Sequence, residues 1–406
     1  MNTERYRLVF NVARGMLVAV QECAKGHGKG RHTVTRAGRG SGAFVPVFWF
    51  TALTAAMMGL PVAPDAHAQT LPIQVDKGAA GAQPYVSTAA NGTPVVNIAP
   101  PNRPGGTSVN NFIQYNVGPS GVVVNNSGQN SQTQIAGWVQ GNMQLGNNHA
   151  GTIVQQVTAP NPSQLLGMQE IAGNRASLVI ANPAGITCSG CGTINADRFT
   201  LTTGRSIFSA GGDLTGFDVR QGAIGIDGQG LSSPQAQVDL LSRAISINAQ
   251  VWADRLNAVA GANQIDRQSL AATPQAGTGA APQMALDASA LGSMYAGAVR
   301  LVGTEKGLGF NIGGNIAAST GDIALDANGD VRILPGARLQ TPGSATIAGT
   351  SIDNAGTITT RGAATVSTPG LLANSGIIAA GTDLMAQADR IMNSGTLAPG
   401  STRAPT

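Results

Sequence analysis

Charged, aromatic and catalytic residue types are scarce in this chain of 406 residues. Asp, Glu, Lys and Arg together form 11% of it, aromatic residues form 4%, and there are four His and three Cys. A helical domain of this size would need many more Glu, Lys and Leu, so the composition argues against an all-α fold. Beyond residue 68 the sequence has one histidine, His149, in a turn-like GNNHAG segment. We read it as an exposed loop residue, which leaves little material for a Ser-His-Asp or Cys-His catalytic arrangement.

An excess of basic over acidic residues is also missing from most of the chain. Residues 1–68 carry eight Lys and Arg against three acidic residues, whereas residues 69–406 carry 16 against 17. The formal net charge of +4 therefore becomes −1 when the first 68 residues are set aside. A nucleic-acid binder needs a basic stripe that neutralises phosphates, so we expect no nucleic-acid partner.

The N-terminal region has the features of a targeting segment. An uncharged apolar run, Ala43–Leu60, follows a basic stretch and is followed by the small-residue pattern Ala66-His67-Ala68. This order predicts a signal peptide over residues 1–68, cleaved between Ala68 and Gln69. The alternative is a membrane anchor, because a run of this length is near the lower limit for a span.

Abundant Gly, Asn, Thr, Ser and short apolar runs predict an all-β protein with frequent turns. The stretch Asn161–Gly204 shows the pattern most clearly, since the runs SLVIA and RFTLTTG alternate with turn residues. Asn161-Pro162 and Asn182-Pro183 each place an Asn, which can bond nearby backbone, before a residue of fixed φ, so both pairs are expected to form stiff corners.

The last hundred residues repeat with a period near 20. Five glycines recur at intervals of 22, 20, 20 and 19 residues and are each followed within three residues by Ile or Leu; they are Gly314, Gly336, Gly356, Gly376 and Gly395. Such a period indicates a solenoid, and the short alternating runs within each repeat suit strands rather than helices. We therefore predict a right-handed parallel β-helix, of roughly 17 coils and about 80 Å at the usual strand spacing. A Gly-rich β-sandwich is the alternative, but it would not impose this period.

The segments NPSQLLG (161–167) and NPAGITCSGCGTINADRFTLTTG (182–204) resemble the secretion domain of two-partner secretion exoproteins, the filamentous haemagglutinin and contact-dependent inhibition family. That family's second motif is usually Asn-Pro-Asn-Gly-Ile, and here Ala184 replaces the second Asn. The leader segment Tyr6–Glu22 resembles the extended signal peptides of large proteins exported by Gram-negative bacteria. Such a segment is a targeting signal rather than a folded domain. The resemblance covers about residues 4–22 and 90–400.

The resemblance implies a domain order and a set of partners. It implies an extended signal peptide at 1–68, a secretion domain at 69–305 with an N-terminal β cap, and β-helix repeats at 306–406. Export would use the Sec machinery and then an outer-membrane β-barrel transporter, and would place the protein outside the cell or on its surface. The residues implied for secretion are Asn161, Pro162, Asn182, Pro183, Gly185 and Ile186.

Cys188-Ser189-Gly190-Cys191 is a close cysteine pair that allows several interpretations. Gly192 stands where a c-type haem site needs His, a zinc site would need two further ligands, and a redox pair would need a helix N-terminus. A structural disulfide closing a tight turn suits an oxidising periplasm, with unpaired thiols as the alternative. We therefore expect no metal or cofactor.

Effector function is less defined than export. Parallel β-helices can carry carboxylates that act on polysaccharide, but the candidate carboxylates are dispersed among turn signals: Asp213, Asp218, Asp227 and Asp239. Trp138 and Trp252 are candidate sugar-stacking platforms, although the alternating run around Trp252 favours core packing or end-capping. We expect a surface loop at 271–283 and no enzyme activity. An adhesin that contacts host or neighbouring cells is preferred, and the delivery portion of a contact-dependent toxin and a polysaccharide-active enzyme are the alternatives.

Overall fold

The computed structural model describes residues 6–11, 16–21 and 73–400. The predicted cleavage site at Ala68 and Gln69 and the apolar run Ala43–Leu60 lie outside these residues. Within the leader, β1 (Tyr6–Asn11) and β2 (Met16–Gln21) pair as antiparallel strands. No helix among the described residues reaches the length and apolarity of a membrane span.

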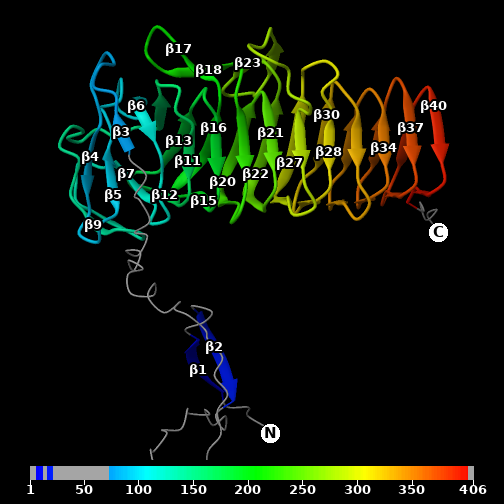
Figure 1. Cartoon of the computed structure of the whole chain (residues 1–406), viewed down its shortest axis with the longest axis horizontal. Helices are drawn as coiled ribbons and strands as arrows, with labels where there is room; N and C mark the ends of the chain where they lie inside the picture. The colour runs from blue at the N-terminus through cyan, green and yellow to red at the C-terminus, as the bar shows by residue number, and fades with distance from the viewer. Residues whose placement is uncertain (1–5, 12–15, 22–72, 401–406) are drawn as a thin grey trace, which may run out of the picture. The chain divides into compact units, whose positions relative to one another are not determined.

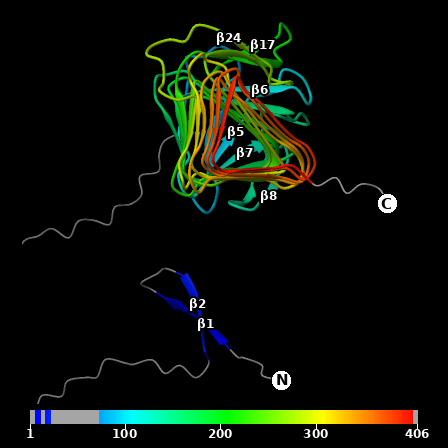
Figure 2. The same ribbon diagram turned by 90° about the vertical axis from the view of Figure 1, so that its right-hand side faces the viewer.

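Residues 73–400 form a parallel β-helix whose coils have three strand faces, which Figure 2 shows end-on as a triangle. We name the faces A, B and C in the order in which the chain visits them in each coil. Face A is a 10-stranded sheet of β11 (Ser163–Leu165), β14 (Ile186–Cys188), β19 (Ala223–Ile226), β21 (Ala244–Ile247), β25 (Leu286–Ala288), β28 (Phe310–Ile312), β31 (Val331–Ile333), β34 (Ile352–Asn354), β37 (Leu371–Asn374) and β40 (Arg390–Asn393).

Faces B and C belong to one continuous sheet, because the long strands β20 (Leu231–Ser242) and β22 (Val251–Ala260) bend from one face to the other. Face B also contains β5 (Pro94–Asn97), β7 (Val122–Asn126), β12 (Met168–Gly173), β15 (Cys191–Ile194), β26 (Met294–Ala296), β29 (Asn315–Ala318), β32 (Arg338–Thr341), β35 (Thr357–Thr360), β38 (Ile377–Ala379) and β41 (Thr396–Ala398). Face C also contains β6 (Thr107–Tyr115), β10 (Thr152–Val157), β13 (Ala176–Ala181), β16 (Ala196–Thr202), β27 (Ala298–Gly303), β30 (Ile323–Ala327), β33 (Ala345–Ala348), β36 (Ala364–Ser367) and β39 (Leu384–Gln387).

The repeat seen in the sequence sets the register of the last coils. The Ile and Leu residues that follow the five glycines are direct parallel partners in β29, β32, β35, β38 and β41, in the order Ile316, Leu339, Ile358, Ile378 and Leu397. The predicted all-β parallel β-helix is thereby confirmed. The predicted 17 coils are wrong, since face A has 10 strands. The estimate divided all residues from 69 to 406 by the repeat length of 20, and so counted the cap and the insertions as coils.

The core is the inside of the triangle. One continuous cluster of buried residues runs from Val96 to Ala380, with aliphatic side chains stacked coil upon coil. Alternation along each short strand directs every second side chain inward, so each coil contributes a few apolar residues to the shared core. No coil could bury its apolar face alone, which is why the stack is the stable unit.

The N-terminal end of the rod is covered, as predicted. β3 (Ile73–Val75) pairs antiparallel with β6, and β4 (Tyr85–Thr88) pairs antiparallel with β5. These reversed strands satisfy backbone groups that would otherwise form an open edge and recruit other chains.

Two antiparallel additions lie outside the coils (Figure 1). β8 (Ser131–Thr133) and β9 (Gly137–Val139) form a hairpin, and β17 (Arg205–Phe208), β18 (Leu214–Val219), β23 (Asn263–Asp266) and β24 (Ala272–Pro274) form a four-stranded sheet. The sheet covers outward apolar residues of face C through a second core that includes Phe217 and Ile265. The surface loop expected at 271–283 therefore begins with a strand, because β24 finds a partner in β23.

Candidate functional site

The two Asn-Pro corners lie directly above one another in successive coils. Asn161-Pro162 precedes β11, and Asn182-Pro183 joins β13 to β14, so both turn the chain from face C to face A. The parallel pairing of β11 with β14 places Ser163 opposite Ile186 and Leu165 opposite Cys188. The 21-residue separation of the two motifs is therefore one turn of the β-helix.

Asn182 joins the two corners through its buried side chain. Its Nδ2 donates hydrogen bonds to the carbonyl oxygen of Asn161 at 2.8 Å and to Oγ of Ser163 at 2.9 Å. Its Oδ1 accepts from the backbone N–H of Ala184 at 2.9 Å, which closes the turn after Pro183. The side chain is fully buried, so an apolar replacement would remove three hydrogen bonds and leave the buried Ser163 hydroxyl without this donor.

Asn161, Gly185 and Ile186 complete the stack. The Nδ2 of Asn161 donates to the carbonyl oxygen of Ile113, one coil below, at 3.2 Å. Gly185 has φ 117°, a backbone conformation that favours glycine, and its carbonyl oxygen accepts from the N–H of Ser163 at 3.0 Å. Ile186 is 2% exposed and belongs to the core. The motif residues thus hold two coils together.

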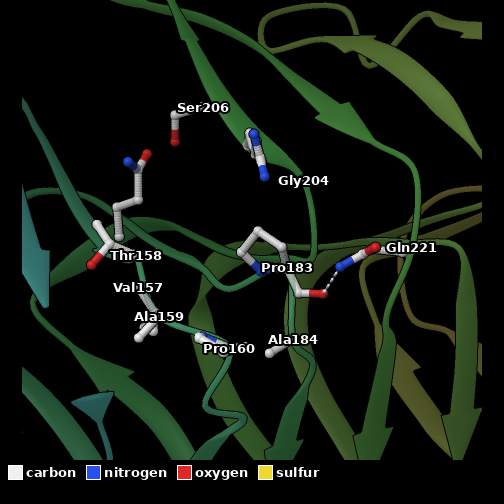
Figure 3. Close-up of a pocket in the computed structure, with 11 residues that line it drawn as sticks. Val157, Thr158, Ala159, Pro160, Pro183, Ala184, Gly204, Ser206 and Gln221 are labelled. Carbon is white, nitrogen blue, oxygen red and sulfur yellow. Dashed lines mark hydrogen bonds between the residues drawn. The ribbon is translucent and has the colours of Figure 1, made fainter. Parts of the chain in front are cut away.

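Of the two motif prolines, Pro183 lines a groove of about 500 Å³. Pro162 is exposed and Pro183 half-buried. Figure 3 shows Pro183 and Ala184 across from Thr158 to Pro160, with Gln221 donating to the Pro183 carbonyl oxygen at 3.3 Å. We call the two stacked corners, residues 161–163 and 182–186, the corner stack. It has a buried side that bonds one coil to the next and a solvent-facing side that is rigid and apolar.

Cys188 and Cys191 form a disulfide across the next corner, where β14 turns into β15. Both cysteines are fully buried, and Gly190, at φ 88°, makes the tight turn between them. Cys188 is stacked between Leu165 and Ile226 of the neighbouring coils. The disulfide is thus part of the core, one strand away from the second Asn-Pro corner.

The four carboxylates considered for catalysis lie on different parts of the molecule. Each accepts hydrogen bonds from a neighbouring side chain, in the pairs Arg103–Asp213, Arg220–Asp218, Asn248–Asp227 and Arg198–Asp239. Asp239 on face C is fully buried and also accepts from Thr200, Gln237 and Asn257. In the part of the chain that the structure describes, no group of three or more His, Cys, Asp and Glu is arranged to hold a metal ion.

Two single residues lie differently from what the sequence predicts. Trp252 was expected in the core or at an end, but it is 45% exposed, because Val251 and Ala253 take the inward positions of β22. His149 was expected to be exposed and is half-buried; its carbonyl oxygen accepts from the N–H of Gly105.

Sequence reasoning also missed polar residues that hold the site region together. Ser163 is fully buried, and its hydroxyl receives a hydrogen bond from Asn182. Arg243 fixes the insertion after β24, since it donates to the carbonyl oxygens of Thr278 and Ala280 and, through two nitrogens, to Glu305. The position of Ser163 directly after Asn-Pro could have indicated its role in the corner. No neighbouring residue indicates the role of Arg243.

The capped β-helix has the fold of a known secretion domain. A family model for the TPS secretion domain matches residues 72–333, and one for the extended signal peptide of type V secretion systems matches residues 1–50. The chain belongs to the TPS secretion domain family. The crystal structure of the filamentous hemagglutinin secretion domain is similar to it at 30% identity and a TM-score of 0.57, covering 80% of this chain and 99% of that one.

Curated relatives are much longer than this chain. It is 42% identical over 339 residues to the toxin CdiA of Yersinia pestis and 46% identical over 339 residues to the tRNA nuclease CdiA-2 of Burkholderia pseudomallei strain 1026b. Each match covers 81% of this chain and 10% of the relative, so the chain spans about a tenth of the length of the relatives it matches. It is a two-partner secretion exoprotein with the targeting and secretion domains of proteins exported across the Gram-negative envelope to the cell surface.

Proposed function

We propose that the partner transporter recognises the segment that carries the two Asn-Pro corners. The observation that carries this proposal is the direct stacking of the corners, which makes the two motifs one continuous feature. Pro162 and Pro183 supply its rigid outer side, and Pro183 also lines the groove of about 500 Å³. Rigid, partly apolar surface is suited to recognition because little entropy is lost on binding.

The buried residues of the same segment serve folding outside the cell. Asn182, Gly185 and Ile186 bond or pack one coil onto the preceding one. A coil that has already formed offers strand edges and apolar side chains to the next segment that emerges. Free energy released by this stepwise stacking supports export without ATP in the periplasm. The Cys188–Cys191 disulfide fixes the corner that follows.

We retain the remaining predictions as part of this proposal. Residues 1–68 act as an extended signal peptide for the Sec machinery, with cleavage between Ala68 and Gln69. Residues 69–305 form the secretion domain and residues 306–406 the first regular repeats. No reaction is assigned to this portion.

The test is release into the medium by a Gram-negative host that carries the transporter. Asn182→Ala and Asn161→Ala are compared with Asn374→Ala, which removes another buried Asn whose Nδ2 donates to Asn393 at 2.7 Å. We expect at least a tenfold fall in release for Asn182→Ala, a smaller fall for Asn161→Ala, and near-normal release for Asn374→Ala. Equal release of all three variants would show that the corners have no special role.

For the effector function we favour the delivery portion of a contact-dependent toxin. Relatives named as CdiA toxins are 42–46% identical to the chain over 81% of its length, whereas the filamentous hemagglutinin domain is 30% identical. The expected result is that cells expressing the complete gene inhibit contacting cells that lack its neighbouring immunity gene. Cell binding without growth inhibition would instead support the adhesin function that we first preferred from the sequence.

A further inference from the structure

The outer surface of face B carries a stack of two aromatic side chains. Trp252 in β22 and Tyr295 in β26 are direct register partners on successive coils. Their ring centroids are 4.4 Å apart and their planes differ by 20°, so the rings lie face to face. Trp252 is nevertheless 45% exposed. Large aromatic side chains left in solvent as a group are a feature of binding surfaces.

The stack ends abruptly at Ala317, the next residue in the same outward column. Its methyl group leaves a slot of about 220 Å³ beside the ring of Tyr295, lined also by Ala296, Ala318 and Ser319. One coil of the β-helix rises by about 4.8 Å. A flat ring needs a contact distance of about 3.5 to 4 Å, so a ring-shaped ligand can continue the aromatic stack over Ala317.

A second, polar hollow continues from this slot along the rod. Its volume is about 450 Å³, and it shares Ala317, Ala318 and Ser319 with the slot. One coil further it reaches Gln340, and two coils further Thr359 and Arg361. None of the residues that line either hollow is acidic, and Arg361 forms no ion pair with the described residues.

We propose that this groove binds an acidic oligosaccharide, with a pyranose ring against Tyr295 and a carboxylate at Arg361. The apolar C–H face of a pyranose suits an aromatic ring, and sugar hydroxyls suit the amide of Gln340 and the hydroxyl of Thr359. The Arg361 guanidinium, roughly 10 Å or two coils from the slot, can bond a carboxylate through two nitrogens.

The geometry favours a saccharide over an extended peptide. A peptide commonly binds a sheet by adding a strand to a free edge. Here β26, β29 and β32 are each paired with a strand on both sides, so the groove offers no edge. The proposal concerns a surface distinct from the corner stack, which lies between faces C and A, and it does not depend on the proposed export function.

The test is titration of the purified full chain with tetragalacturonate and, as a neutral ligand of equal length, maltotetraose. Binding is followed by tryptophan fluorescence and calorimetry. We expect tetragalacturonate to bind at least tenfold more tightly than maltotetraose, and Arg361→Gln to remove most of that difference. Tyr295→Ala and Ala317→Phe should each weaken tetragalacturonate binding at least tenfold, the second because its own ring fills the slot.

Two controls keep the result interpretable. Ala317→Phe lies on the outer surface and leaves Tyr295 in place, so it reports on the slot even if Tyr295→Ala affects folding. Trp138→Ala removes an exposed tryptophan of β9, outside the groove, and should leave binding unchanged. Failure of both saccharides to bind, or equal binding by wild type and Ala317→Phe, would overturn the proposal. So would binding of N-acetyl-tryptophanamide in place of the saccharides, since this would indicate an aromatic protein partner.

Discussion

The coils before and after residue 305 are held together in different ways. In the later coils similar contacts recur: glycines stack at one corner, and in the last three coils Asn354, Asn374 and Asn393 form a chain of side-chain hydrogen bonds of 2.7 Å. In the earlier coils different polar contacts join each coil to the next, such as those of Asn182 at the corner or of Asp239 on face C. Specific polar contacts thus hold the coils that carry the two Asn-Pro motifs and the insertions, and regular stacking holds the later coils.

Removal of the Asp239 carboxylate should lower the free energy of unfolding more than the other changes below, because the earlier coils depend on individual polar networks such as this one. Asp239→Ala would leave Arg198 without its carboxylate partner on a largely buried face. Loss of one partner of a buried ion pair costs about 3 to 5 kcal/mol, so we expect a loss of about 4 kcal/mol in the free energy of unfolding. Denaturant unfolding would measure it. Exposed Asp353→Ala in β34 is the control and should change stability by less than about 0.5 kcal/mol.

A methyl group added at Gly376 tests how the later coils stack. Their stacking depends on close contact between backbones rather than on polar side chains. A Cβ there would lie 2.0 Å from the carbonyl oxygen of Gly356, and the backbone cannot move aside without separating the coils. We expect Gly376→Ala to cost about 3 kcal/mol. Gly336→Ala is the matched control: it meets nothing within 4 Å but has φ 87°, so its cost should be about 1 kcal/mol. Equal costs for the two variants in thermal unfolding would contradict this account.

The disulfide should contribute less than either of these features. Cys188→Ala with Cys191→Ala removes a bridge that closes a very short loop. Loop-closure entropy for such a loop corresponds to about 2 kcal/mol. Unfolding in denaturant with and without a reductant would measure the difference. The reductant should destabilise the wild type and leave the double variant unchanged, and a wild type insensitive to complete reduction would contradict the prediction.

Acid should loosen the insertion at residues 275–284, which Arg243 holds in place. This is the smallest of the expected effects on stability. Hydrogen bonds from Arg243 lower the pKa of Glu305 below its ordinary value near 4.3. The stabilisation is therefore complete above about pH 4.3 and is lost as the pH falls through the lower pKa of the folded state. Hydrogen exchange at residues 275–284, corrected for intrinsic rates, should increase over that range. Glu305→Gln should show no such acid step.

The regular part of the fold was predictable from the sequence, and the irregular part was not. Glycines and Ile or Leu residues at a period near 20 predicted the partners from Ile316 to Leu397, because a solenoid converts sequence period into register. The four-stranded outer sheet was missed, although Gly211-Gly212 between two alternating runs is a hairpin signal. Contacts such as Asn182 with Ser163 or Arg243 with Glu305 join residues 19 and 62 positions apart and leave no local pattern.

Candidate site residues were predicted by position but not by role. Asn182 and Pro183 were chosen together, yet the structure separates a buried amide that bonds the coils from a proline beside an open groove. Their assignment to transporter recognition stays a prediction. Trp252 was misplaced, because an alternating run determines which residues share a face but not which face points inward.

We expect this chain to leave the cell through a dedicated outer-membrane partner. The most direct measurement is the amount of wild-type protein on the cell surface and in the medium, in a host with and without the neighbouring transporter gene. We predict release that depends on the transporter, with the protein confined to the periplasm when the gene is absent. Equal release in both hosts would contradict the claim.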